Sequence, residues 1–399
     1  MAIEILEEKS KAGQPGIKAF EKPVPIIDPN LPDWETVRDR FKEIYRSKML
    51  TNSSTVKELE LKAARFLGVK EVVAVSSCTL GIVLTLRALG IDGEVIVPSF
   101  TFSATGHAVY WSGATPVFVD SDPETWNISI DSVKKAIGPE TRAIVAVHIF
   151  GNPADVEELE RIARENHIKL IFDAAHAFGA TVGTRRIGSF GDAEIFSLSP
   201  TKLLTGSEGG LIATNDTGLA ETLRSLRNYG HSSGYDCAMV GLNARMSEMH
   251  AAVAVEGIPL VDGEIATRER LAGIYREKLS RLPGIRFQKV PEGNMHTYKD
   301  FTIVIEDKEF GISRDTLCDL LAEQNIQTKK YFYPPLHWQS AYSHLPKRVM
   351  DVGTAEWLTK RVLTIPLYSS LGEEGVRKIA DTIDAVRMKA LNRNQIEIG

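Results

Sequence analysis

Lys202 and Asp173 are the two residues whose types and surroundings point most directly to chemistry. Lys202 lies in the segment 197–210, a run rich in small hydroxyl-bearing residues that ends in paired glycines. A lysine in such a turn can lose its hydration, which lowers its pKa and frees a neutral amine to attack an aldehyde. Asp173 ends the apolar run 170–172, where a carboxylate can pair with a protonated ring nitrogen. Together they predict a pyridoxal phosphate (PLP) site, although a lone lysine in a glycine-rich loop is more often simply exposed.

A phosphate group needs backbone N–H groups at a helix N-terminus together with hydroxyls, and the segment 76–81 offers both. This segment lies between an expected strand and an expected helix, so Cys78 and Thr79 fall at the start of that helix. Ser197, at the end of the strand before the lysine, could add a hydroxyl. The motif is weak by itself, because small polar residues before a helix are most often plain caps.

Four further residues complete the candidate site. Phe102 follows a short strand and could cover a planar cofactor, although an aromatic residue there is more often part of the core. His176, three residues after the aspartate, could bind a cofactor substituent or orient the carboxylate. Asn243 and Arg245 precede a helix that Ser247 would cap, and capping explains neither of them.

Short apolar strands alternate with helices through the first half of the chain. Strands are expected at 71–76, 94–97, 115–119, 142–148, 169–172, 193–196 and 210–214, and helices at 79–89, 103–112, 130–137 and 156–166. Strands that are apolar on both faces are typical of a mostly parallel sheet buried between helices, so the fold class is α/β. Ligands of such sheets bind at strand ends, where the pattern places both Asp173 and Lys202.

The flanking segments suggest a division into an arm and two domains. A helix is expected at 33–48 with Asp33 as its N-cap, and a second at 56–67 that Gly68 ends. Beyond the sheet we expect helices at 219–227, 247–261, 264–282, 314–324 and 373–388 and a strand at 299–305. We therefore predict an N-terminal arm at 1–32, a large cofactor-binding α/β domain at 33–265, and a smaller α+β domain at 266–399.

Composition argues against several classes of protein. The chain has 399 residues and a net charge of −5 without a basic block, which argues against nucleic-acid binding. Its three cysteines form no CxxC pair, so neither a disulfide framework nor a metal site is expected. The acidic N-terminus lacks the apolar core of a signal peptide, and no run of about 18 apolar residues occurs. We expect a cytoplasmic protein that does not interact with membranes.

These residues resemble the nucleotide-sugar aminotransferase family, a DegT-type branch of the fold type I PLP-dependent enzymes. Any one of its motifs would be modest evidence, but eight of them occur here in order and at the expected spacing, over about residues 45–385. The matching segments are 50–52, 97–102, 172–180, 188–192, 196–210, 242–248, 333–337 and 363–368.

The resemblance implies a role for each candidate residue. Lys202 would bind PLP as a Schiff base, Asp173 would pair with the ring nitrogen, and His176 would lie near the ring hydroxyl. Phe102 would stack on the ring. Cys78, Thr79 and Ser197 would bind the phosphate, and Asn243 would reach the phosphate of a neighbouring subunit, which makes a homodimer with shared sites. Arg245, His337 and Ser199 are substrate candidates.

The implied reaction is a ping-pong transfer of an amino group, with glutamate as donor, onto a nucleotide-linked keto-(deoxy)sugar. Four positions depart from the family pattern. Cys78 stands where glycine is usual and Gly81 where alanine is usual, while Ser199 replaces a frequent histidine and Ala244 a frequent aromatic residue. These departures concern the phosphate loop and the sugar preference rather than the chemistry.

Three alternative functions fit less well or remain open. The related PLP sugar dehydratases carry histidine in place of the lysine, so Lys202 argues against that activity. The second alternative is a non-enzymatic relative that acts as a sensor or regulator. The complete set of Lys202, Asp173 and Ser197 argues against loss of PLP, but not against a regulatory role. A cyclitol or an aminobenzoate-type precursor could replace the nucleotide sugar as the acceptor.

Overall fold

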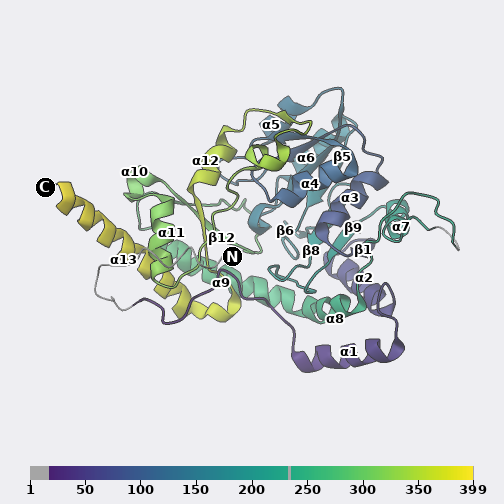
Figure 1. The fold of residues 1–399 in the computed structure, drawn as a ribbon, viewed down its shortest axis with the longest axis horizontal. Coiled ribbons are helices and arrows are strands. Elements are labelled where there is room, and N and C mark those ends of the chain that lie inside the picture. Colours follow the sequence, from purple (N-terminus) through teal and green to yellow (C-terminus); the bar gives the residue numbers. More distant parts are fainter. Residues whose placement is uncertain (1–17, 232–234, 399) are drawn as a thin grey trace.

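The fold is organised around one eight-stranded sheet (Figure 1). The computed structural model describes residues 18–231 and 235–398. In spatial order the strands are β1 (Glu71–Val75), β9 (Gly210–Thr214), β8 (Ala193–Ser197), β5 (Lys169–Asp173), β4 (Thr141–Val147), β2 (Glu94–Pro98), β3 (Thr115–Val119) and β13 (Arg348–Val349). Strand β9 runs antiparallel to both of its neighbours, while the other adjacent strands pair in parallel.

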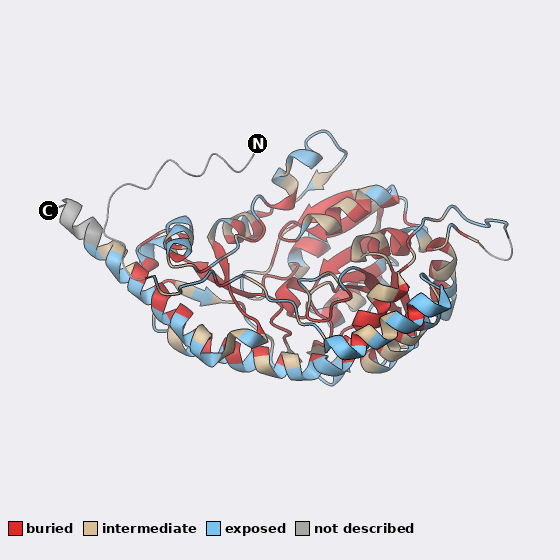
Figure 2. Ribbon diagram, turned by 60° about the horizontal axis from the view of Figure 1, so that its bottom comes forward, coloured by how far each residue is buried: buried red, intermediate tan, exposed pale blue. Residues whose placement is uncertain are grey.

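Helices cover both faces of this sheet, so its central strands are buried on both sides. On one face the apolar core includes residues of α3 (Cys78–Ala88), α4 (Ser103–Ser112) and α7 (Thr217–Leu226). On the other face it includes residues of α2 (Ser54–Leu67), α5 (Ile130–Ala136), α6 (Val156–Glu165) and α8 (Glu248–Gly257). The prediction of a mostly parallel sheet between helices is confirmed. In Figure 2 the buried residues concentrate in the sheet and on the inner sides of these helices.

Local sequence signals predict the start of α1 and the end of α2 correctly. Helix α1 (Trp34–Ser47) begins after Asp33, whose carboxylate accepts a hydrogen bond from the backbone N–H of Thr36 at 3.1 Å. Helix α2 ends at Gly68, which takes the left-handed conformation at φ 70° that glycine adopts without strain. These two caps are therefore where the sequence placed them.

A smaller α+β unit follows. Its antiparallel sheet has the order β10 (Ile285–Phe287), β12 (Phe301–Ile305) and β14 (Val362–Ile365). Its helices are α9 (Val261–Leu279), α10 (Asp307–Phe310), α11 (Arg314–Glu323), α12 (Gly353–Arg361) and α13 (Gly372–Ile398). A third small sheet joins β11 (Asn294–Met295) to the hairpin of β6 (Thr181–Val182) and β7 (Arg185–Arg186).

Helix α9 takes part in both cores. Val261 and Ile265 pack in the core beneath the large sheet, while Leu271, Tyr275 and Leu279 pack in the core of the smaller unit. These contacts support a boundary within α9, and we propose the division at residue 265. The segment that carries β13 returns from the second unit to pair with β3 of the first.

The described part of the N-terminal arm packs along the smaller unit. Val24 is buried, and its backbone N–H donates to the carbonyl of Asn325 at 2.8 Å. Five residues earlier in the arm, the backbone N–H of Ala19 donates to the side-chain oxygen of Gln324 at 2.9 Å. Residues 1–17 of the predicted arm lie outside the described residues. Within the described ranges, no helix combines the length and apolarity that crossing a membrane requires.

Candidate active site

A cavity of about 190 Å³ opens where the carboxyl ends of the central strands meet the loops that follow them. It brings together eight of the predicted site residues, which come from segments far apart in the sequence. They are Cys78, Thr79, Phe102, Asp173, His176, Ser197, Ser199 and Lys202. The other lining residues include Thr101, Glu208 and Gly209.

Asp173 is a buried carboxylate at the last position of β5. It accepts hydrogen bonds from the Thr105 hydroxyl at 2.7 Å and from the backbone N–H of Ala175 at 3.1 Å. Burial raises the pKa of Asp173, and these two bonds offset that shift only in part. No lysine, arginine or histidine of the described chain lies within ion-pair distance of it, so this carboxylate can accept a cationic partner such as a protonated ring nitrogen.

Lys202 supplies the amine on the other side of the cavity. Its backbone N–H donates to the carbonyl of Ser199 at 3.0 Å, in the turn that follows β8. Burial lowers the pKa of Lys202 to about 8, and the charge of Lys299 adds to that shift. About a tenth of the Lys202 side chains are then neutral at pH 7, which makes the amine a competent nucleophile.

The N-terminus of α3 forms the third part of the site. Ser77 caps the helix by accepting the backbone N–H of Leu80 at 3.2 Å, which leaves Cys78 and Thr79 at the first helical positions. Helix N-termini attract anions through free N–H groups and the helix dipole. Burial and the nearby Asp173 raise the pKa of the Cys78 thiol, so Cys78 brings no negative charge against a phosphate.

The paired glycines after Lys202 have a packing reason. A Cβ atom at Gly210 would lie 2.6 Å from the backbone nitrogen of Cys78, so only glycine lets β9 approach the start of α3 this closely. Gly209 adopts φ 140°, a conformation that favours glycine. The loop that carries Lys202 and the turn at Ser77 and Cys78 are thereby held in contact.

His176 and Phe102 provide a hydrogen-bond donor and an aromatic surface. The backbone N–H of Phe150 donates to Nδ1 of His176 at 3.2 Å, and this leaves the ring hydrogen on Nε2. Burial and then Lys202 keep the pKa of His176 well below its usual value, so the imidazole is neutral. Phe102 is 58% exposed at the lip of the cavity, where a planar ligand could cover it.

The donor set fits PLP. The cavity holds an amine with a lowered pKa, a buried carboxylate without a cationic partner, and a helix N-terminus, which match the aldehyde, the ring nitrogen and the phosphate of that cofactor.

Comparison with known proteins agrees with this geometry. Residues 33–384 match the model of the DegT/DnrJ/EryC1/StrS aminotransferase family. The chain belongs to this family. Aminotransferases of the DegT type depend on PLP, and so does this enzyme.

Curated relatives cover most of the chain. It is 33% identical over 369 residues to dTDP-4-amino-4,6-dideoxy-D-glucose transaminase of Shigella dysenteriae, a match that spans 92% of this chain and all of the relative. It is 37% identical over 328 residues to UDP-N-acetyl-3-dehydro-alpha-D-glucosamine 3-aminotransferase of Acidithiobacillus ferrooxidans, over 82% of this chain and 86% of the relative. The crystal structure of DesI with its TDP-sugar product superposes with a TM-score of 0.90 at 34% identity, over 96% of this chain and 98% of that chain.

Three candidates of the DegT-type pattern lie outside the cavity of their own chain. The Arg245 guanidinium donates to the side-chain oxygens of Asn243 and Asn228, both at 3.1 Å, on an exposed segment. His337 is held between the hydroxyl of Ser99 at 2.5 Å and the carboxylate of Glu356 at 3.2 Å. The structure therefore gives Arg245 and His337 other partners, and their substrate roles stay predictions.

Sequence reasoning missed the residues that support Asp173. Thr105 is one of several hydroxyl-bearing residues in 99–105, and nothing in its spacing distinguishes it from Ser103 or Thr101. The N–H of Ala175 carries no side-chain signal at all. Glu208 also lines the cavity, and only its place between Lys202 and the glycines could have drawn attention to it.

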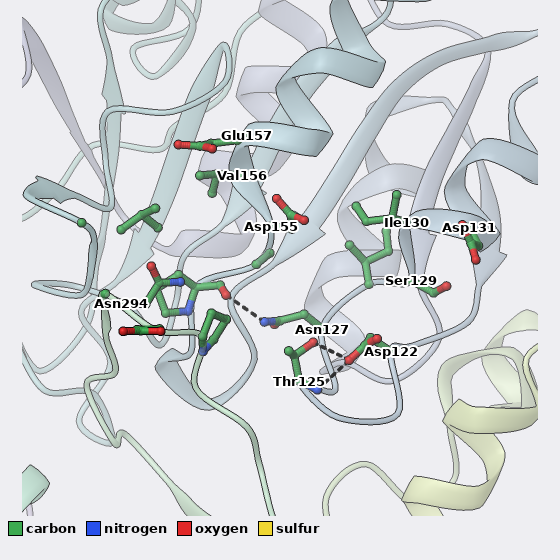
Figure 3. A pocket seen from close by; sticks show the side chains of 18 residues that line it. Asp122, Thr125, Asn127, Ser129, Ile130, Asp131, Asp155, Val156, Glu157 and Asn294 are labelled. Atoms are coloured by element: carbon green, nitrogen blue, oxygen red, sulfur yellow. Dashed lines mark hydrogen bonds between the residues drawn. The ribbon is translucent and has the colours of Figure 1, made fainter.

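A second, larger cavity of about 590 Å³ lies between the loops before α5 and α6 (Figure 3). Two of its five acidic side chains serve local structure. Asp122 accepts from the hydroxyl and the N–H of Thr125, and Asp155 caps α6 through the N–H of Glu158. The described residues include no group of three or more histidine, cysteine or acidic side chains placed to share a metal ion.

Proposed function

We propose that this enzyme transfers an amino group from glutamate to a nucleotide-linked keto-(deoxy)sugar and thereby makes an amino sugar. The observation that carries the proposal is the convergence of Lys202 and Asp173 on one cavity beside the N-terminus of α3. Three kinds of nucleotide-sugar enzyme support the choice of acceptor, because the relatives include a dTDP-sugar transaminase, a UDP-sugar aminotransferase and a GDP-perosamine synthase.

Several side chains of the cavity have a task in binding PLP. We assign the phosphate to the N-terminus of α3 with Cys78 and Thr79, and to the hydroxyl of Ser197. Asp173 pairs with the ring nitrogen, and the Nε2–H of His176 is the donor for the ring hydroxyl. Phe102 covers the ring, where it also keeps water from the reacting face.

Bound PLP supplies an aldehyde that reacts with amines and a ring that takes up a pair of electrons. Two side chains of the enzyme, Lys202 and Asp173, hold or move the protons of the reaction. The amine of Lys202 would be the group that takes up and carries the proton leaving the donor's Cα. Asp173 holds the proton on the ring nitrogen, because a buried carboxylate gains most from a cationic neighbour. Two half-reactions at one site give ping-pong kinetics.

The purified enzyme tests this proposal directly. Glutamate alone should change the absorbance of the bound cofactor and release one equivalent of 2-oxoglutarate per site. Nucleotide keto-sugars added afterwards should restore the first spectrum and gain an amino group, which mass spectrometry detects. Restoration by a cyclitol or an aminobenzoate precursor, and by no nucleotide sugar, would contradict the proposed acceptor. A cofactor spectrum that no amino acid alters would contradict the enzymatic function.

We further propose a homodimer with shared sites. Met49 and Leu50 are exposed apolar residues, and the backbone of this segment pairs with residues 246–248 next to Asn243. Trp34 and Tyr45 on α1, and Leu242 next to Asn243, are further exposed apolar residues. A second copy on this surface would bring Asn243 toward the partner's phosphate site, which explains why Asn243 lies outside the cavity of its own chain.

Mixed dimers test the shared site. Lys202→Ala and Asn243→Ala chains are each expected to be inactive as homodimers. Their heterodimer should recover up to half of the wild-type activity per dimer, because one of its two sites contains both intact residues. A verified heterodimer without activity would contradict the shared site. The cytoplasmic location remains part of the same proposal, supported by three free cysteines and by the phosphorylated substrate class.

A further inference from the structure

Lys329 is an exposed lysine that has no carboxylate within ion-pair distance among the described residues. The neighbouring lysines differ in this respect. Lys299 is buried and contacts both carboxylate oxygens of Asp300, at 2.9 and 3.0 Å. Lys330 is bound to Asp315 at 2.5 Å. Lys329 therefore keeps a charge that the protein itself does not neutralise.

Aromatic packing connects Lys329 to the cavity. Its Nζ lies 4.5 Å from the ring centroid of Tyr331, which is nearly buried and packs against Phe150 at 5.7 Å. Phe150 in turn stacks on His176, which lines the cavity, with an angle of 7° between the rings. The backbone of Lys329 also pairs in both directions with Thr364. These contacts hold the ammonium group near the cavity but outside its lining.

The positive charge of Lys329 acts on His176, a residue that lines the cavity. After burial, Lys202 and Lys299, it is one of the charges that keep the pKa of His176 below its usual value. Within the lining, Asp173 and Glu208 are acidic, His176 is neutral, and Lys202 is engaged in the chemistry. The lining therefore lacks a cation that could recognise a second carboxylate on the amino donor.

We propose that Lys329 binds the side-chain carboxylate of the amino donor and so selects glutamate, an inference that rests on the aminotransferase function proposed above. The donor's Cα must lie at Nζ of Lys202, so its side chain extends away from the catalytic lysine. A dicarboxylic amino acid then needs a cation beyond the lining, and Lys329 is a cation that packing through Tyr331 and Phe150 links to His176. Glutamine has the same length but lacks the charge.

The first half-reaction tests this assignment in the holoenzyme without the sugar. The cofactor absorbance is followed after mixing with glutamate or with glutamine, for wild type, Lys329→Gln, Lys329→Arg and the matched control Lys330→Gln. Lys329→Gln should raise the half-saturating glutamate concentration by about 10- to 100-fold, as expected for loss of a charge-assisted hydrogen bond. The half-saturating glutamine concentration should stay unchanged, Lys329→Arg should retain most of the glutamate affinity, and Lys330→Gln should behave as wild type.

Three results would overturn the assignment. An equal loss with glutamate and glutamine would mean that Lys329 supports the structure rather than the side-chain carboxylate. A loss confined to the second half-reaction would mean that Lys329 binds the nucleotide phosphates instead. Unchanged glutamate saturation in a folded Lys329→Gln holoenzyme would remove Lys329 from the site and leave the proposed function intact. A wild-type enzyme that ignores glutamate would instead contradict the donor in the proposed function.

Discussion

The larger and the smaller cavity differ in the charged side chains that line them and in the surroundings of those side chains. The larger one, about 590 Å³, is lined by five acidic side chains, of which Asp122 and Asp155 accept hydrogen bonds from the backbone N–H groups beside them. The smaller one, about 190 Å³, holds a carboxylate and an amine whose pKa values burial shifts in opposite directions, Asp173 upward and Lys202 downward. Cavity size alone would favour the larger cavity. A buried carboxylate and a buried amine with shifted pKa values are typical of functional sites, and this favours the smaller cavity.

Removal of the amine is the strongest test of this contrast. Lys202→Ala should abolish transamination and the covalent attachment of PLP, with a rate loss of at least about 10²–10⁴-fold from the missing proton transfer alone. Turnover with glutamate and the absorbance of the bound cofactor measure both effects. Turnover at the wild-type rate would show that the smaller cavity is not the catalytic site.

Asp173→Asn should be the next most damaging change. The amide keeps the size of the side chain but cannot stabilise a proton on the ring nitrogen, so the first half-reaction should slow by about 10- to 100-fold. Single-turnover absorbance with glutamate measures this rate. Thr105→Val is a useful companion, because it removes only the hydroxyl that supports Asp173 and should have a smaller effect in the same direction.

The pKa of Lys202 predicts a pH dependence for cofactor attachment. With a pKa of about 8, each pH unit below 8 reduces the neutral amine about tenfold, and above 8 the amount levels off. When PLP is mixed with the enzyme after cofactor removal, the attachment rate should therefore rise from pH 6 to 8 and then reach a plateau. Stopped-flow absorbance at a series of pH values measures it. A rate that continues to rise to pH 10 would mean that burial does not perturb Lys202.

A change in the larger cavity should affect stability alone. Asp155→Ala removes the N-cap of α6 and should lower the free energy of unfolding by about 1 kcal/mol. Turnover and PLP affinity should remain at wild-type values. Chemical denaturation gives the first quantity and steady-state kinetics the second. A large loss of activity with intact folding would make the larger cavity a functional site after all.

The sequence predicted the large sheet because its strands and helices carry local signals. The apolar run before Asp173 and the glycine at 68 are examples that the structure reproduces. Shorter elements carry no such signal. The hairpin of β6 and β7 has two residues in each strand, and β13 is defined by its pairing with β3, more than 200 residues away.

The residues of the candidate site fall into the same two groups, those with a signal in the sequence and those without one. Lys202 and Asp173 stand out by residue type and by position at strand ends, so the sequence singles them out, and the structure places both at one cavity. Thr105 supports Asp173 from another helix, and the relation of Lys329 to His176 passes through Tyr331 and Phe150. Both relations exist only after the chain has folded, so no spacing in the sequence could reveal them.

The shared helix α9 limits how this enzyme can move. Val261 and Ile265 anchor one end beneath the large sheet, and Leu271, Tyr275 and Leu279 anchor the other end in the smaller unit. Because this continuous helix packs in both apolar cores, a hinge motion between the two units would break apolar contacts in one of the cores. We therefore expect entry and release of the two substrates to depend on loops and side chains at the rim, such as the exposed Phe102.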